Sequence, residues 1–137
     1  MISFIPEAGR EDTMFIRKLS ETPFTRVMDQ SILAELLHPD KEPLAGDLGC
    51  SVAFAIVPQK EATLPHRLNS STELYFILEG QGEMHIEEEK ETVEPGNIVL
   101  IPAGSRQWIA NTGPKDLTFI CIVSPRWKET DEELIQG

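Results

Sequence analysis

The sequence predicts an all-β domain, because its apolar segments are short, nearly evenly spaced and separated by turn-forming residues. The chain has 137 residues, a length that suits one domain with its own hydrophobic core. Its ten prolines and nine glycines are scattered between the apolar runs, as expected where strands alternate with tight turns. Short strands at regular spacing are typical of a β-sandwich or a β-barrel.

Eight segments carry the apolar and β-branched residues expected of strands. In chain order they are Met14–Leu19, Ile32–Leu37, Ser51–Val57, Glu73–Leu78, Glu83–Glu88, Asn97–Ile101, Gln107–Ala110 and Leu117–Val123. Turn signals such as Glu79-Gly80-Gln81-Gly82 and Pro102-Ala103-Gly104 separate them. Near the end of the chain, residues 131–136 are typical of a short helical turn.

Three of the predicted strands are apolar on both faces, which bears on assembly. Residues 74–78, 98–101 and 119–123 do not alternate as a strand with one solvated face should. The outer face is therefore expected to be covered, either by the N-terminal fifty residues or by a second subunit, and we predict a homodimer. Residues 1–49 are expected to form an arm on the barrel or on the partner, residues 50–125 the barrel, and residues 126–137 an acidic tail.

Charge and cysteine usage exclude several classes of partner. The formal net charge of −11 repels phosphate backbones and anionic membranes, so neither nucleic acid nor a membrane is an expected partner. The sequence lacks a long apolar run and begins without a signal peptide, which predicts a cytoplasmic protein. Its two cysteines, Cys50 and Cys121, are far apart in apolar surroundings and are expected to be buried free thiols.

Two stretches of the chain resemble the paired motifs of the cupin superfamily. The first runs from Pro65 to Gly80 and carries His66 and Glu73, with the glycine at the motif's usual distance from the glutamate. The second has Gly96, then Pro102-Ala103-Gly104, Gln107 and Asn111 at the spacing of the second motif. The resemblance covers about residues 50–125 and implies a cupin jelly-roll barrel, or double-stranded β-helix, of the small single-domain kind.

The usual metal-ligand set of the family is incomplete in this chain. Lys60 stands at the leading glycine of the first motif, Leu68 at its second histidine, and Gln107 at the histidine of the second motif. Leu68 cannot coordinate a metal, whereas Gln107 offers an uncharged carbonyl oxygen. His66, Glu73 and Gln107 could thus hold a divalent ion weakly, with zinc, iron, manganese and nickel not distinguished. Alternatively, His66 and Glu73 form a metal-free pair that Gln107 bridges.

Strand alternation places the candidate site residues inside the predicted barrel. Glu73 shares parity with Tyr75 and Ile77, and a carboxylate among apolar side chains needs a partner, for which His66 is the obvious candidate. Tyr75 either donates its hydroxyl into the pocket or ends a core stack. Ligand contacts are therefore expected from His66, Glu73, Tyr75 and Gln107, and the candidates for catalysis are Glu73, His66 and Tyr75.

The remaining polar candidates have competing interpretations. His85 alternates with apolar neighbours and is expected to face outward, and His38 is expected on the surface, in a turn before a proline. Cys121 is expected to be a core thiol. A further set flanks the motifs and could hold an anion at the rim, or else point to solvent or a dimer interface: Arg67, Arg106 and Trp108.

Three classes of function remain. The favoured one is a domain that binds a small polar or anionic molecule in the barrel, with a weakly held divalent metal as an option. The second is a metal-dependent enzyme similar to the cupin sugar isomerases, epimerases or lyases, in which Glu73 or His66 would move a proton. A dioxygenase is disfavoured, because its iron requires ligands that this chain lacks. The third is an accessory protein with a vestigial pocket.

Overall fold

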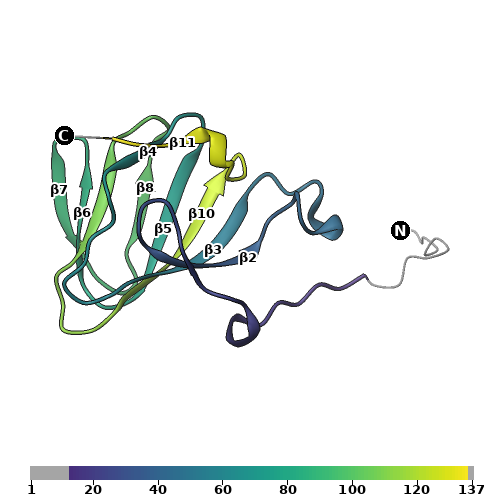
Figure 1. The fold of residues 1–137 in the computed structure, drawn as a ribbon, viewed down its shortest axis with the longest axis horizontal. Coiled ribbons are helices and arrows are strands. Elements are labelled where there is room, and N and C mark those ends of the chain that lie inside the picture. The colour runs from purple at the N-terminus through teal and green to yellow at the C-terminus, as the bar shows by residue number, and fades with distance from the viewer. Residues whose placement is uncertain (1–12, 136–137) are drawn as a thin grey trace.

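Two antiparallel β-sheets face each other in the computed structural model, which describes residues 13–135 (Figure 1). The larger sheet has the strand order β1-β2-β3-β10-β5-β8 and the smaller one β11-β4-β9-β6-β7. The bounds are β1 Thr25–Arg26, β2 Ile32–Leu37, β3 Ser51–Val57, β4 His66–Leu68, β5 Thr72–Glu79, β6 Gly82–Ile86, β7 Glu89–Val93, β8 Ile98–Ile101, β9 Gln107–Asn111, β10 Leu117–Ser124 and β11 Glu132–Leu134. Short 3₁₀ turns lie at Leu19–Glu21, Pro43–Ala45 and Glu129–Asp131. The predicted all-β jelly-roll is confirmed.

The core fills the space between the two sheets and follows the alternation of the strands. Inward side chains of β5 and β10, such as Ile77 and Phe119, are almost completely buried against Ile109 of β9. The rings of Tyr75 and Phe119 lie 4.2 Å apart between their centroids. Burial of this apolar surface is the main force that holds the sheets together, at roughly 25 cal/mol per Å².

One predicted strand is wrong. Residues 14–18 have no regular structure, and the segment ends in the 3₁₀ turn Leu19–Glu21. Met14 and Ile16 are exposed there and pack into no core, so their apolar character gave a misleading signal. The other seven predicted strands are present, each with ends that differ by no more than two residues.

Four strands were not expected from the sequence. β1 and β4 are short, and β7 is rich in charge and mostly exposed, so none of them carries a clear apolar pattern. β11 occupies part of the predicted C-terminal helical turn. The helical turn itself lies slightly earlier, at Glu129–Asp131, and Gln136 is outside the described residues.

The outer face of the larger sheet is apolar and exposed. Ile98 and Leu100 of β8 are 65% and 60% exposed. Phe76 of β5 lies between Ile98 on one side and Ile120 of β10 on the other. Large contiguous apolar patches on a soluble protein usually mark an interaction surface.

Strands from both flanks of the predicted barrel segment extend the two sheets at their edges. β2 pairs with β3, and β11 pairs with β4, so that Glu132 lies opposite Leu68 and Leu134 opposite His66. β4 meets β9 through a single residue pair, His66 with Gln107. Within residues 13–135, no helix has the length and apolar character needed to cross a membrane.

Candidate functional site

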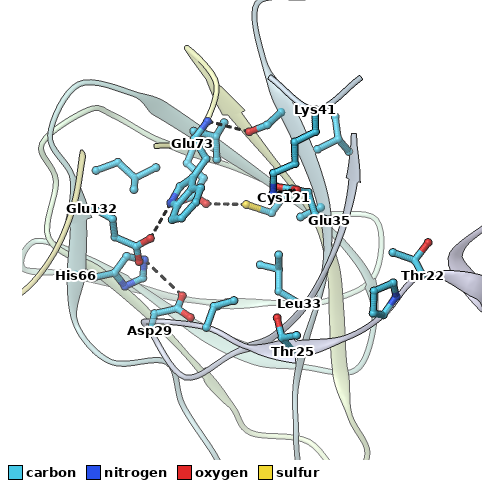
Figure 2. A pocket seen from close by; sticks show the side chains of 18 of the residues that line it. Thr22, Thr25, Asp29, Leu33, Glu35, Lys41, His66, Glu73, Cys121 and Glu132 are labelled. Atoms are coloured by element: carbon cyan, nitrogen blue, oxygen red, sulfur yellow. Dashed lines mark hydrogen bonds and ion pairs between the residues drawn. The ribbon is translucent and has the colours of Figure 1, made fainter. Parts of the chain in front are cut away.

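A cavity of about 410 Å³ lies between the larger sheet, β4 and two flanking segments, residues 17–29 and 127–132. Figure 2 shows Asp29, His66 and Glu132 together at one end, and Lys41 and Glu35 at the other. Apolar side chains such as Leu33, Leu68 and Val123 also line it. This volume is in the range of pockets that take small organic molecules.

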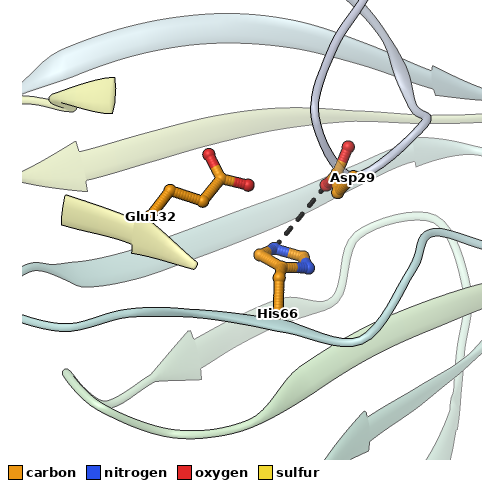
Figure 3. A group of neighbouring side chains, drawn as sticks. All are labelled: Asp29, His66 and Glu132. Atoms are coloured by element: carbon orange, nitrogen blue, oxygen red, sulfur yellow. Dashed lines mark ion pairs between the residues drawn. The ribbon is translucent and has the colours of Figure 1, made fainter. Parts of the chain in front are cut away.

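Three potential metal ligands meet at the first end of the cavity (Figure 3). Asp29 lies in the turn between β1 and β2, His66 on β4 and Glu132 on β11. One ligand atom from each lies within 4.8 Å of the other two, and Nε2 of His66 is 3.6 Å from Oδ2 of Asp29. One imidazole and two carboxylates are a donor set that suits several divalent metals.

The ring of His66 is oriented by the segment that leads into β4. Nδ1 lies 2.7 Å from the carbonyl oxygen of Leu64, which can only accept, so Nδ1 carries a hydrogen and donates. In the neutral ring Nε2 then carries no hydrogen, and its lone pair faces the carboxylates of Asp29 and Glu132. Such an arrangement is unfavourable unless a proton or a cation lies between them. Metal-binding histidines commonly donate their other ring N–H to a backbone carbonyl in this way.

The carboxylate of Asp29 is held on the side away from His66. Oδ1 accepts hydrogen bonds from the backbone N–H of Ser31, at 2.9 Å, and from its hydroxyl, at 2.7 Å. Gln30 adopts φ 76° in this tight turn. The backbone carbonyl of Asp29 accepts from the N–H of Leu64, so a single residue anchors both Asp29 and His66. Oδ2 is left facing the cavity.

Glu132 is held by an indole. The Nε1–H of Trp127 donates to Oε1 of Glu132 at 2.8 Å. Burial raises the pKa of the Glu132 carboxyl, while the hydrogen bond from Trp127 lowers it. Each of the three ligands at this end of the cavity thus has a partner that fixes its direction, as is usual around metal sites.

The positions of the family's usual ligands do not form a metal cage here. Oε1 of Glu73 accepts from the amide of Gln107 at 2.8 Å, and Oε2 accepts from the thiol of Cys121 at 2.6 Å. The amide oxygen of Gln107 accepts from the hydroxyl of Tyr75 at 3.0 Å. Both oxygens of Glu73 and the carbonyl of Gln107 are therefore engaged, and Leu68 has no donor atom.

The predicted site residues occupy different positions relative to the cavity. His66, Glu73 and Leu68 line it, whereas Tyr75 and Gln107 lie in the wall behind Glu73 and are not among its lining residues. In the described structure no hydrogen bond or ion pair joins His66 to Glu73, because His66 faces Asp29 instead. The expected His66–Glu73 pair bridged by Gln107 is therefore replaced by two separate groups.

The prediction for His38 is wrong, whereas the one for His85 agrees with the structure. His38 was expected on the surface, but it is buried. Burial is tolerated because both of its ring nitrogens are hydrogen-bonded to backbone groups. His85 is half-buried on the outer side of β6, where it stacks on Trp108 at 3.5 Å.

The flanking residues do not form an anion-binding rim. None of Arg67, Arg106 and Trp108 lines the cavity, and Arg67 pairs with Glu133. Both cysteines are free, with Cys50 half-buried and Cys121 buried at the cavity wall.

Asp29, Trp127 and Glu132 were not identified from the sequence. Glu132 belongs to an acidic run that was interpreted as a solvated tail, and Asp29 is a single acid in a loop. The role of Asp29 and Glu132 depends on tertiary contacts, since each lies more than 30 residues from His66 along the chain. The available signal was weak: Trp127 is the one aromatic residue in an acidic tail.

The buried carboxyl of Glu73 leads to a pH-dependent prediction. Burial raises its pKa above the usual value near 4.5, against the hydrogen bonds from Cys121 and Gln107. The folded state therefore binds this proton more tightly than the unfolded chain, so the contribution of Glu73 to stability is full below the unfolded pKa and is lost as pH rises through the folded pKa. Glutamine does not titrate, so we expect Glu73→Gln to become more stable relative to wild type as pH rises from the unfolded pKa of Glu73 through its folded pKa.

Urea unfolding between about pH 4.5 and pH 8 measures this difference. Glu79→Gln, at the exposed end of β5, serves as the matched control and should give a constant difference. A Glu73→Gln difference that does not change with pH would contradict the assignment.

Comparison with known proteins agrees with this architecture. An uncharacterised protein of Methanocaldococcus jannaschii is 34% identical over 128 residues, which cover 90% of this chain and all of the relative. A 5-nitrosalicylic acid 1,2-dioxygenase of a Bradyrhizobium species is 43% identical over 74 residues, which cover 54% of this chain and 33% of that protein.

Solved structures share the fold at low sequence identity. A predicted oxalate decarboxylase of Thermotoga maritima has a TM-score of 0.72 at 22% identity, covering 81% of this chain and 99% of that one. The Streptomyces nucleoside dehydratase Pac13 has a TM-score of 0.71 at 15% identity, covering 90% of this chain and 92% of its own. The sequence profile of the cupin domain matches residues 53–123. The chain therefore belongs to the cupin domain family.

Proposed function

We propose that this protein binds a small polar molecule in the barrel cavity, together with a divalent metal ion held by Asp29, His66 and Glu132. The observation that supports this most strongly is that one ligand atom from each residue meets at the cavity wall and each side chain is held by a hydrogen bond. A metal bound there would polarise an oxygen of the ligand.

The charge of the cavity supports a cation. Asp29 and Glu132 place two carboxyl groups beside one imidazole, and Glu73 adds a third carboxyl to the wall. A free anion entering this end would be repelled, whereas a divalent ion would compensate the two carboxylates. The anionic ligand expected from the sequence is therefore proposed only in the presence of the metal.

Metal binding tests the proposal directly. We expect one zinc or manganese ion per chain in equilibrium dialysis, and a loss of affinity of about 100-fold in Asp29→Asn or Glu132→Gln, because each change replaces a charged carboxylate ligand with a weaker, uncharged amide. Glu133→Gln is the matched control, since Glu133 is the next residue and pairs with Arg67 outside the cavity. If wild-type protein binds no divalent ion, or Glu133→Gln loses as much as Glu132→Gln, the site is wrong.

A metal-dependent isomerase, epimerase or lyase is the second candidate. Glu73 supports it, because its buried carboxyl lines the same cavity and its pKa is raised toward the range useful for proton transfer. Incorporation of solvent deuterium into sugars or 2-oxo acids incubated with the metal-loaded protein would measure such transfer. The second candidate fails if wild-type protein and Glu73→Gln give the same incorporation.

The apolar outer face of the larger sheet supports a homodimer. We propose that a second copy covers Phe76, Ile98, Leu100 and their neighbours, which are exposed in the single chain. Phe76→Lys places a charge in the centre of this face and should give monomers in sedimentation velocity at a concentration where wild type is dimeric. Thr92→Lys, on the exposed strand β7, is the control and should leave the dimer intact.

The division of the chain is part of the same proposal. Residues 50–125 would supply the barrel, while the arm of residues 1–49 and the tail of residues 126–137 each contribute one ligand, Asp29 and Glu132. A cytoplasmic location stays a prediction from the sequence.

A further inference from the structure

We propose that His38 is a positioning residue for the cation ligand Glu132, and that it acts through Trp127. The inference rests on the proposed cation site. His38 lies just after β2, outside the cavity lining, and is only 6% exposed. A buried histidine away from the motif residues needs partners for both ring nitrogens, and those partners show what it holds in place.

The hydrogen bonds of His38 have a defined direction. The backbone N–H of Asp40 can only donate, and it lies 3.1 Å from Nδ1 of His38, so Nδ1 is an acceptor. In the neutral ring Nε2 then carries the hydrogen and donates it to the carbonyl oxygen of Trp127 at 2.8 Å. The ring therefore links the segment after β2 to the chain that follows β10.

Trp127 is held on both sides of its backbone. Its carbonyl accepts from His38, and its N–H donates to the hydroxyl of Ser51, on β3, at 2.9 Å. From this fixed position the indole donates to Oε1 of Glu132 at 2.8 Å. The sequence of contacts thus runs from His38 through Trp127 to a carboxylate of the cation site.

Glu132 depends on this support because its own strand is short. β11 has three residues and follows directly on the 3₁₀ turn Glu129–Asp131. Its pairing with β4 fixes the backbone of Glu132 opposite Leu68 but leaves the side chain several rotatable bonds. The indole N–H is the described contact that selects one direction for the carboxylate, and partners of this kind affect metal affinity by about 10-fold to 100-fold.

Zinc affinity of the full-length protein, measured by equilibrium dialysis, tests the inference. We expect His38→Phe to weaken zinc binding by about 10-fold and His38→Gln to restore most of it, because the glutamine amide can both donate to Trp127 and accept from Asp40. Asp40→Asn is the matched control: it removes the exposed ion pair of Asp40 with Arg126 on the same loop and should leave zinc affinity unchanged.

A double-mutant cycle separates positioning from a general loss of structure. If His38 acts through Trp127, His38→Phe should have no further effect on zinc affinity once Trp127→Phe is present. Additive losses would overturn the inference. Unchanged zinc affinity in His38→Phe would also overturn it, whereas absence of zinc binding by wild type would instead reject the cation site itself.

Trp127 provides an independent optical readout. In a Trp108→Phe background Trp127 is the remaining tryptophan, and zinc should change its fluorescence when Glu132 is engaged. We expect His38→Phe to shift the midpoint of this titration by the same factor as in dialysis. If His38→Phe does not fold, Ser51→Ala releases the backbone N–H of Trp127, which lies on the other side of the residue from the carbonyl that His38 holds. This variant should weaken zinc binding severalfold, and no change there would overturn the inference.

Discussion

Replacing Gln107 with leucine should destabilise the protein by about 2–6 kcal/mol, because two buried groups lose their partner and each costs about 1–3 kcal/mol. The amide of Gln107 accepts from Tyr75 and donates to Glu73, and all three side chains are buried. Leucine has a similar size, so the loss reflects unsatisfied polar groups rather than a cavity.

Urea unfolding at pH 7 measures this loss, with Gln81→Leu at an exposed position of the turn before β6 as the control. The variant should also raise the pKa of Glu73 further, since the hydrogen bond from Gln107 lowers it. A change below about 0.5 kcal/mol, the range typical of surface substitutions, would contradict a buried network.

Phe119→Ala should cost about 3–5 kcal/mol through loss of apolar burial and the cavity left behind. Phe119 is the largest of the fully buried side chains, and its ring packs on Tyr75 between the sheets. Since natural domains are stable by only about 5–15 kcal/mol, this variant should be close to unfolding.

The thermal midpoint and urea unfolding of Phe119→Ala report the effect together. Phe24→Ala is the control, because Phe24 is 39% exposed and packs by its edge on Phe54 at the outer face. An equal loss in both variants would mean that the core between the sheets is not the main source of stability.

The barrel could be predicted from the sequence because its signals are local. Strands such as Ser51–Val57 and Leu117–Ser124 carry continuous apolar runs, and the turn residues between them mark where each ends. Strands that depend on a partner gave no such signal. β7 consists largely of charged residues, and β11 is a three-residue edge strand that pairs with β4 alone among the described strands.

The site was only partly predictable for a related reason. His66 and Glu73 were found because motif spacing and strand parity both place them on the inner side of the barrel. Asp29 and Glu132 reach the cavity through pairing of distant segments, which residue spacing does not encode. The direction of the His66 ring also depends on its hydrogen bond to Leu64, two residues before it and outside β4, which strand parity cannot reveal.

The origin of the three proposed ligands has an evolutionary consequence. His66 lies within the segment shared with the cupin domain, whereas Asp29 and Glu132 lie in flanking segments outside it. Mutation of either flank would then change metal selectivity without repacking the core between the sheets. Homologues that keep the same barrel should therefore differ most in which metal they bind, through substitutions in the two flanking segments.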